Sequence, residues 1–188
     1  MTKTVKVGGL YMKSTKKLIV SGSIALISLA LLVALDQWTK LWAVQNLMGQ
    51  PDIVLIKDVL VFQYLENTGA AFGLLKNQAW LFIFFTIVFL AFAIYLFKKM
   101  PKTKRFLPLH IIIVVLLAGA IGNLIDRVSY AYVIDFIYFV PINFPIFNIA
   151  DMYVTISAAI LILLIIFVYN DDDFVFLNAK RDSEAEDV

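Results

Sequence analysis

Two aspartates flank a short segment between two long apolar stretches. Asp135 lies in the sequence Val-Ile-Asp-Phe, and Asp151 ends the sequence Phe-Asn-Ile-Ala-Asp. A carboxylate at bilayer depth costs about 3 kcal/mol or more, so an aspartate held there is a candidate for function. Two carboxyl groups in one place do not both ionise easily, and one of them keeps a proton near neutral pH. An ionised base beside a protonated acid can activate water, which is the chemistry of an aspartic protease.

The composition is that of a membrane protein. Of the 188 residues, 62% are hydrophobic and 16% are charged, and the mean hydropathy is +0.88, whereas a soluble domain has about 45–50% apolar residues. The net charge of +2 gives no sign of a nucleic-acid-binding surface. The absence of cysteine excludes disulfides, thiol catalysis and cysteine metal sites. We interpret the single histidine, His110, as a helix-end residue distant from the aspartates.

Four apolar stretches have the length of about 20 residues that a transmembrane helix needs. The sequence predicts helices over residues 18–35, 79–97, 107–124 and 152–169. Lys16 and Lys17 precede the first stretch as in a signal peptide, but no small-x-small cleavage site follows, so we interpret it as a retained helix. We expect a single integral membrane domain over residues 1–188. The acidic chain from Asn170 is expected to be solvated, with a disordered tail over about 178–188.

The basic residues are divided unequally between the two sides of the membrane. The N-terminal segment, the 98–105 loop and the C-terminal tail together contain twelve of the 16 Lys and Arg residues, and the opposite side contains four. The positive-inside rule therefore places both termini in the cytoplasm. Both aspartates consequently lie at the outer face of the membrane.

Two segments at the outer face are expected to have structure of their own. Residues 53–56 and 59–65 are rich in Val, Ile and aromatic residues and are predicted to form two strands of a small extracytoplasmic β-sheet, or cradle. Because open sheet edges cannot face lipid, this sheet lies at the headgroup level or above. Residues 130–147 contain seven aromatic rings and two prolines, and are predicted to form an interfacial aromatic flap. The fold class is thus an all-α membrane protein of four helices with these two additions.

Polar residues recur at helical spacing near the outer ends of three predicted helices. Three sets share a helix face at spacings of three or four: Asp36 with Lys40, Asn123 with Arg127, and Asn148 with Asp151 and Thr155. One such set would join helices to each other, whereas three sets at one depth favour a shared polar pocket. Spacing favours Asp151 as a pocket residue and leaves Asp126 and Asp135 as alternatives for the second carboxylate.

Two other classes of protein are less consistent with this pattern. A non-enzymatic channel or transporter subunit would carry polar residues along the whole depth of its helices, but residues 111–117 and 160–167 are almost entirely apolar. A rhomboid-type serine protease needs a Ser–His pair at one depth, and His110 is at the wrong end of its helix. A pocket open to one side of the membrane therefore remains the favoured interpretation.

Five motifs occur in an order that is typical of one family. They are Asp36-Gln37-Trp38-Thr39-Lys40, Asn67-Thr68-Gly69-Ala70-Ala71-Phe72-Gly73, Gly122-Asn123-Leu124-Ile125-Asp126-Arg127, Val133-Ile134-Asp135-Phe136 and Phe147-Asn148-Ile149-Ala150-Asp151. Over about residues 14–170, the chain resembles the lipoprotein signal peptidases (signal peptidase II). Each motif alone is weakly specific, but five in order on a chain with four membrane helices are very specific.

The resemblance implies an intramembrane aspartic endopeptidase of the bacterial cytoplasmic membrane. Such an enzyme removes the signal peptide from diacylglyceryl-modified prolipoproteins by cleaving before the lipid-modified cysteine. The resemblance further implies that Asp135 and Asp151 are the catalytic dyad and that no metal or other cofactor takes part. The implied partners are prolipoprotein substrates, membrane lipids and globomycin-type inhibitors, and no nucleic acid.

The resemblance also implies roles for residues around the dyad. The substrate-binding residues that it implies are Asn67, Asn123, Arg127 and Asn148. A second group matches the family pattern as supporting residues, namely Asp36, Lys40 and Gly69.

A first prediction concerns the dyad. Asp135→Asn and Asp151→Asn are each expected to abolish signal-peptide cleavage while the protein still inserts and folds, because the amide cannot replace the ionised base or share the proton. Asp126→Asn is expected to retain more activity than either. Cleavage of a prolipoprotein by the three purified variants measures this. Processing at the wild-type rate by either dyad variant would contradict the assignment.

Overall fold

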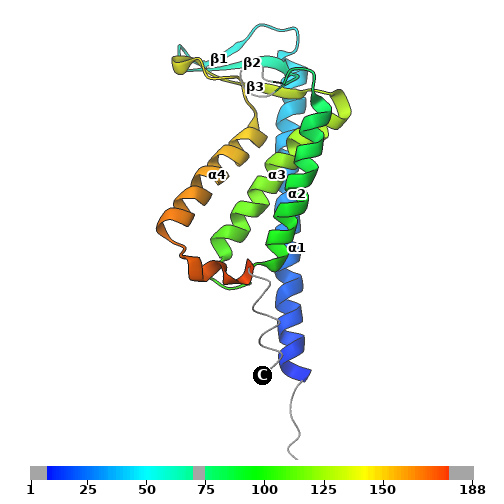
Figure 1. The fold of residues 1–188 in the computed structure, drawn as a ribbon. Helices are drawn as coiled ribbons and strands as arrows, with labels where there is room; N and C mark the ends of the chain where they lie inside the picture. The colour runs from blue at the N-terminus through cyan, green and yellow to red at the C-terminus, as the bar shows by residue number, and fades with distance from the viewer. Residues whose placement is uncertain (1–7, 70–74, 178–188) are drawn as a thin grey trace, which may run out of the picture.

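Four long helices form a bundle that carries a small sheet across one end (Figure 1). The computed structural model describes residues 8–69 and 75–177, with the side chains of the first helix from Gly22 onward. The helices are α1 (Gly8–Leu47), α2 (Ala79–Lys99), α3 (Leu107–Tyr130) and α4 (Ile149–Phe167). Each is long and apolar enough to cross a membrane, α1 over its Gly22–Leu47 part. The four predicted membrane helices are therefore confirmed.

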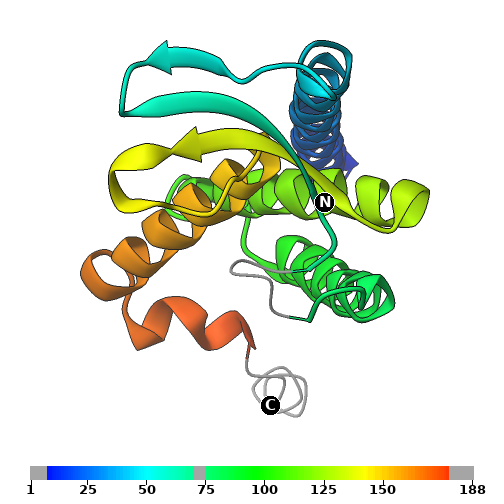
Figure 2. The ribbon, with the colours of Figure 1, turned by 90° about the horizontal axis from the view of Figure 1, so that it is seen from above.

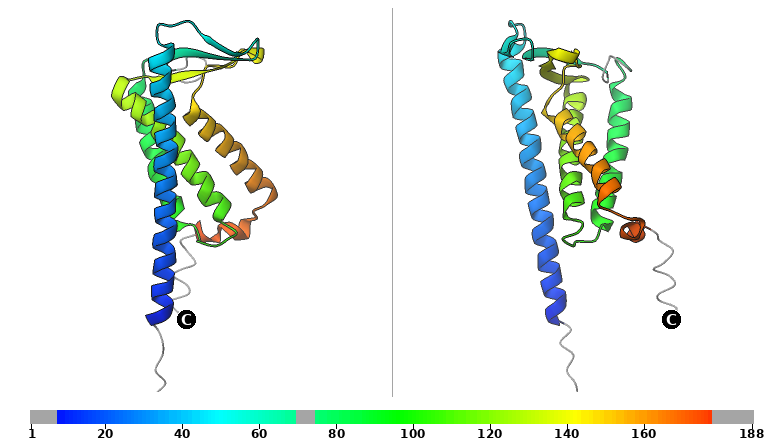
Figure 3. Two further views of the ribbon diagram at one scale, coloured as in Figure 1. Left: turned by 180° about the vertical axis from the view of Figure 1, so that it is seen from behind. Right: turned by 90° about the vertical axis from the view of Figure 1, so that its left-hand side faces the viewer.

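The first helix continues well beyond its predicted end at residue 35. Asp36 and Lys40 lie inside α1 with side chains only 0% and 1% exposed, and Lys40 Nζ is 3.0 Å from Asp36 Oδ2. Because these opposite charges are paired and shielded from lipid, they do not end the membrane helix. α1 is the longest helix, and Figure 3 shows it extending past the other three at the end opposite the sheet.

The fourth helix begins three residues earlier than predicted. The Asn148 side chain accepts a hydrogen bond from the Asp151 backbone N–H at 2.9 Å, and the Asp151 carboxylate accepts one from the Asn148 N–H at 3.3 Å. This reciprocal capping box satisfies two N–H groups that the start of a helix leaves unpaired. Asp151 therefore lies in the first turn of α4.

The third helix is the one around which the others are arranged. In an 18-residue apolar stretch of α3, 56% is buried inside the protein, compared with 6–11% in the corresponding stretches of the other three helices. Two glycines allow this close packing: a Cβ atom at Gly119 would clash with the Ala150 carbonyl of α4, and one at Gly122 would clash with the Asp36 carboxylate of α1. Small residues thus let two helices approach α3 closely.

Three antiparallel strands cross the end of the bundle in the order β1–β2–β3 (Figure 2). They are β1 (Ile53–Ile56), β2 (Leu60–Asn67) and β3 (Val133–Phe139). The two predicted strands are confirmed, and β2 extends to Asn67. The sequence did not predict β3, which occupies part of the expected aromatic flap. Residues 133–137 are buried, and β3 pairs with a strand far away in the sequence, which no local pattern could indicate.

The rest of the aromatic segment returns along the outer edge of β3. After the short 3₁₀ helix η2 (Val140–Ile142), the Phe147 carbonyl accepts hydrogen bonds from the N–H groups of Phe136 at 3.1 Å and Ile137 at 2.8 Å. The rings of Phe144 and Phe147 pack edge to face at 5.7 Å. Residues 144–147 therefore lie beside the strand that carries Asp135.

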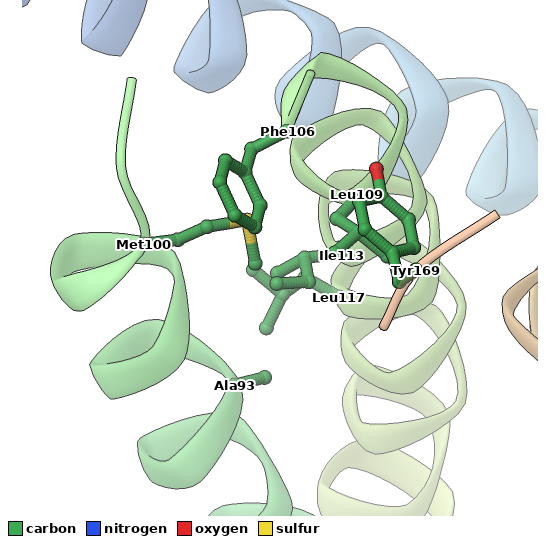
Figure 4. Packing of buried hydrophobic residues seen from close by; sticks show 7 residues of the cluster. All are labelled: Ala93, Met100, Phe106, Leu109, Ile113, Leu117 and Tyr169. Atoms are coloured by element: carbon green, nitrogen blue, oxygen red, sulfur yellow. The ribbon is translucent and has the colours of Figure 1, made fainter. Parts of the chain in front are cut away.

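Two apolar clusters stabilise the two ends of the bundle. The cluster at the end away from the sheet consists of Ala93, Met100, Phe106, Leu109, Ile113, Leu117 and Tyr169 (Figure 4). The cluster that joins the sheet to α1 is built around Ala43, Leu47, Ile134, Phe136 and Ile137. The second cluster fixes β3, and hence Asp135, relative to the membrane helices.

The chain after α4 packs onto the bundle. Asp171–Leu177 form the 3₁₀ helix η3, from which Phe174 and Phe176 contact the cluster of Figure 4. Arg105 forms an ion pair with Asp173. The expectation that the chain is solvated from Asn170 onward is therefore wrong for these residues, because the two phenylalanines find apolar partners.

Two further predictions concern His110 and the C-terminal tail. His110 lies in the first turn of α3, where its Nδ1 is 2.9 Å from the Phe106 carbonyl oxygen, as expected of a helix-end residue. The predicted tail over 178–188 and the motif residues 70–73 lie outside the described residues.

The helix contact at Gly122 can be tested by a pair of glycine variants. Gly122→Ala is expected to lower the thermal midpoint in detergent by several degrees, because the added methyl group displaces the buried Asp36 carboxylate. Gly22→Ala is the matched control, since the added methyl group has no contact within 4 Å apart from the neighbouring residues and backbone of its own helix. Alanine is the better helix former by about 1 kcal/mol, so the control is expected to be neutral or slightly stabilising. Equal midpoints for the two variants would contradict the tight packing.

Candidate active site

The carboxyl groups of Asp135 and Asp151 line one cavity. Asp135 projects from β3 and Asp151 from the first turn of α4, and both border a cavity of about 700 Å³. The polar residues that share its lining are Asn67, Asn123, Arg127, Thr86 and Thr155. The rest of the wall is mostly apolar and comes from α2, α3, α4 and residues 144–147. Asp126 is absent from this wall, so the geometry favours Asp135 as the partner of Asp151.

Asn148 forms hydrogen bonds with both aspartates. Its Nδ2 donates to Asp135 Oδ1 at 2.6 Å, while its Oδ1 accepts from the Asp151 N–H at 2.9 Å. Its side chain is fully buried and does not line the cavity. Asn148, which is predicted to bind substrate, thus contacts both aspartates from its position as the cap of α4.

Asn67 contacts Asp135 from the sheet side. Its Nδ2 donates to Asp135 Oδ2 at 2.8 Å, and its Oδ1 accepts from the Gly69 N–H at 3.0 Å. The Gly69 N–H thereby fixes which end of the amide faces the carboxylate. Asn67 and Gly69 both line the cavity, as the sequence predicted for one substrate-binding and one supporting residue.

Asn123 links the dyad to a buried group of charges. Its Nδ2 donates to Asp151 Oδ1 at 2.7 Å, and its Oδ1 accepts from Lys40 Nζ at 2.9 Å. Lys40 Nζ also lies 3.0 Å from Asp36 Oδ2 and 2.9 Å from Asp126 Oδ2. The exposed fraction of all three charged side chains is 1% or less, so the three form a sealed ion triplet.

The sequence analysis missed two members of this buried network. Asp126 was considered only as an alternative to Asp135, and Gln37 was not considered as a site residue. The Gln37 amide nitrogen lies 3.2 Å from Asp36 Oδ2, 3.1 Å from Asp126 Oδ1 and 3.1 Å from the Gly122 carbonyl oxygen. The spacing of three between Asn123 and Asp126, which puts both on one helix face, was the available signal for Asp126.

Arg127 presents a cation to the cavity. Its guanidinium carbon lies 4.7 Å from the centre of the Phe82 ring on α2, and the side chain is partly buried. Within the described residues Arg127 forms no ion pair. Stacking on an aromatic face leaves the N–H groups at the edge of the guanidinium available for another acceptor.

The environment of Asp135 favours its protonated form. Burial, and next the charge of Asp151, raise the pKa of Asp135 to about 7, against the hydrogen bonds from Asn67 and Asn148 that lower it. A carboxyl group with this pKa can hold a proton at neutral pH beside an ionised partner. One acid and one base can therefore coexist in the cavity.

The amino-acid sequence is similar to those of known proteins. A family model described as "Signal peptidase (SPase) II" matches residues 28–167. The chain belongs to the signal peptidase II family. Its function is therefore the removal of signal peptides from prolipoproteins, and the alternative of a channel or transporter subunit is not favoured.

Individual relatives agree with this membership. A lipoprotein signal peptidase of Clostridium tetani is 44% identical, with 79% of this chain and 94% of the relative covered. One of Streptococcus pyogenes serotype M5 is 38% identical with the same coverage. A solved bacterial membrane enzyme, determined by the in meso method at 1.9 Å resolution, has a TM-score of 0.69 and 32% identity over 78% of this chain and 95% of that one. This signal peptidase thus shares both sequence and fold with bacterial membrane enzymes.

The raised pKa of Asp135 predicts an effect on stability. Its ordinary pKa is 3.8, so the folded protein binds this proton more tightly than the unfolded chain. The associated stability is fully present below about pH 4 and is lost as the pH rises through about 7. Asp135→Asn removes this loss. Its thermal midpoint in detergent is expected to exceed that of wild type at pH 8, by a margin that shrinks toward pH 4.

A surface variant separates this effect from a general effect of charge. Asp58 is exposed at the β1–β2 turn, so Asp58→Asn is expected to leave the midpoint unchanged at both pH values. An Asp135→Asn midpoint at or below wild type at pH 8 would contradict the prediction.

Proposed function

We propose that this signal peptidase is an aspartic endopeptidase in which Asp135 and Asp151 form the catalytic dyad. Its substrates are diacylglyceryl-modified prolipoproteins, which it cleaves immediately before the lipid-modified cysteine. The observation that carries this proposal is that two carboxyl groups from different elements line one cavity, and that one of them has a pKa near neutrality. The five motifs of the sequence support the same residues.

The dyad shares one proton and holds a water molecule. The ionised carboxylate takes a proton from this water as the water oxygen bonds to the scissile carbonyl carbon, while the other carboxyl donates its proton to the carbonyl oxygen. In the second step the C–N bond breaks, the first carboxyl protonates the leaving nitrogen, and the second regains a proton from the intermediate. No covalent intermediate is needed. The pKa values that govern activity belong to the pair.

The surrounding amides and Arg127 set the geometry of the reaction. Asn67 and Asn123 donate to opposite members of the dyad at 2.8 and 2.7 Å, which fixes the carboxylate planes. Arg127, stacked on Phe82, is positioned to bind carbonyl oxygens of an extended peptide. Holding a peptide near its attack geometry supplies much of the rate enhancement of such enzymes.

The apolar part of the cavity suits the lipid of the substrate. Below the dyad the lining consists mainly of apolar residues of α2, α3 and α4, including Phe89, Leu116 and Leu161. Hydrocarbon gains free energy in such a lining. A substrate that enters from the bilayer can thus keep its acyl chains in apolar surroundings while its peptide reaches the dyad.

The enzyme lies in the bacterial cytoplasmic membrane with both termini in the cytoplasm. The excess of basic residues at the N-terminus, in the 98–105 loop and in the tail supports this orientation. The sheet and the dyad are at the opposite end of the bundle from this loop (Figure 1). The active site consequently faces outward. A cyclic peptide such as globomycin inhibits by occupying the dyad.

A cleavage assay with matched substrates tests the proposal. Purified protein is expected to release the signal peptide from a diacylglyceryl prolipoprotein, with the new N-terminus at the lipid-bearing cysteine by mass spectrometry. The unlipidated form is expected to be cleaved at least about 100-fold more slowly, because it lacks the lipid binding energy that positions the peptide. Globomycin is expected to stop cleavage.

The pH dependence of the same assay reports the shared proton. The rate is expected to fall as the pH rises above about 7, because the dyad then loses the proton that its acid donates. Cleavage by the Asp135→Asn or Asp151→Asn variant, or no release of the signal peptide by wild type, would overturn the proposal.

A further inference from the structure

The ion triplet of Asp36, Lys40 and Asp126 is connected to the backbone next to each proposed catalytic aspartate. Asp126 Oδ2 accepts a hydrogen bond from the Ile134 N–H at 3.1 Å, and Ile134 directly precedes Asp135. Asp36 Oδ1 accepts one from the Ala150 N–H at 2.9 Å, and Ala150 directly precedes Asp151. Lys40 joins the two carboxylates. One cation therefore joins, through two carboxylates, the backbone beside both proposed catalytic aspartates.

The contact of Lys40 with Asn123 determines which way the Asn123 side-chain amide is oriented. The Lys40 ammonium donates to Asn123 Oδ1 at 2.9 Å, and Asn148 Nδ2 lies 3.1 Å from the same oxygen. With its oxygen held there, the Asn123 Nδ2 must face Asp151, to which it donates at 2.7 Å. The reversed amide would place an NH₂ group against an ammonium and an oxygen against a carboxylate. Both contacts would be repulsive, so Lys40 permits only one orientation.

We propose that Lys40 is a positioning residue that acts through Asn123: it fixes the amide so that a hydrogen-bond donor always faces Asp151, while its two carboxylate partners hold the backbone beside the dyad. This role rests on the proposed function, in which Asp135 and Asp151 carry out the cleavage. Lys40 is 1% exposed and does not line the cavity, so it acts without touching substrate.

Two variants, one of which keeps the net charge of the wild-type cluster, test the contact between Lys40 and Asn123. Asp126→Asn keeps Lys40 paired with Asp36 and retains an oxygen for the Ile134 N–H. The double variant Lys40→Met/Asp126→Asn removes one positive and one negative charge, so the cluster keeps the net charge of the wild type. Only the double variant removes the ammonium from the oxygen of Asn123. Its cluster has the net charge of the wild type, so a loss of kcat relative to wild type does not come from a changed net charge, and Asp126→Asn measures the part that Asp126 alone contributes.

The expected result is a loss in kcat that is specific to the double variant. Asp126→Asn is expected to keep kcat within about tenfold of wild type. The double variant is expected to lose at least a further 30-fold in kcat, with KM within about threefold, because a single misdirected donor costs about 100-fold or more. A purely structural role would instead lower the amount of folded protein and leave kcat per folded molecule unchanged. Equal kcat values for the two variants would overturn the proposal.

A second variant keeps the proposal testable if the double variant does not fold. Asn123→Asp has the same shape, and its second oxygen faces Asp151 without a donor unless it is protonated. The charged groups around it are Asp36 and Lys40 on α1, Asp126 and Arg127 on α3, Asp135 on β3 and Asp151 on α4. The new oxygen faces Asp151 Oδ1, so a proton between the two carboxyl groups is needed to restore the hydrogen bond, and low pH supplies it.

Asn123→Asp is therefore expected to lose about 100-fold in kcat at pH 7.5 and to recover most of it near pH 5. A profile parallel to that of wild type would overturn the proposal, since the direction of the group at position 123 would then be irrelevant. Failure of the proposed function is distinguishable, because in that case wild type would not cleave or Asp135→Asn would remain active.

Discussion

The buried ammonium of Lys40 forms the contacts on which the sheet-bearing end of the bundle depends. Removing an ammonium from water costs several kcal/mol, about the stability of a whole small domain. Here each of its three N–H groups has an oxygen acceptor within 3.0 Å. The acceptors come from α1 and α3, and the carboxylates among them also bind backbone N–H groups of β3 and α4. One cation thus joins four elements at the point where the active site must be assembled.

The distribution of polarity explains how such a cluster survives in a membrane protein. Charged and amide groups are gathered where the sheet meets the helices, and nearly every one of their polar atoms has a partner. At the opposite end the bundle is held by aromatic and aliphatic packing, as between Phe106 and Tyr169, whose rings stack at 5.8 Å (Figure 4). A polar network that is fully satisfied can be buried at modest cost, whereas a partly satisfied one could not.

The environment of Asp135 has opposing effects on its pKa. Burial and mutual repulsion raise the pKa of Asp135, while hydrogen bonds from Asn67 and Asn148 act in the opposite direction. Without these donors the Asp135 carboxyl group would hold its proton more firmly, and with less burial it would lose the proton more easily. The site is thus less stable than an apolar packing of the same volume, as is common where function needs ionisable groups.

Much of this architecture could be predicted from local patterns. Long apolar runs specify membrane helices because the bilayer requires every backbone group to be bonded within its own segment. The strands at 53–56 and 60–67 could likewise be recognised from their β-branched and aromatic residues. β3 could not, because its aromatic residues also suit an interfacial belt and its partner lies on the far side of α2 and α3 in the sequence. Local spacing likewise could not indicate that Asn148 contacts both Asp135 and Asp151.

By itself, the sequence determined the number of membrane helices, the end of the bundle that carries polar groups, and Asp151 as a pocket residue. It left Asp126 and Asp135 as equal candidates until a resemblance to known motifs separated them. In the tertiary structure their surroundings differ, since Asp126 is bound to Lys40 and Asp135 lines the cavity. Spacing along a helix specifies which residues share a face, but which of them meets a group on another element depends on how closely the elements pack. Here that distance is set by the contacts of Gly119 and Gly122, which only the folded chain brings together.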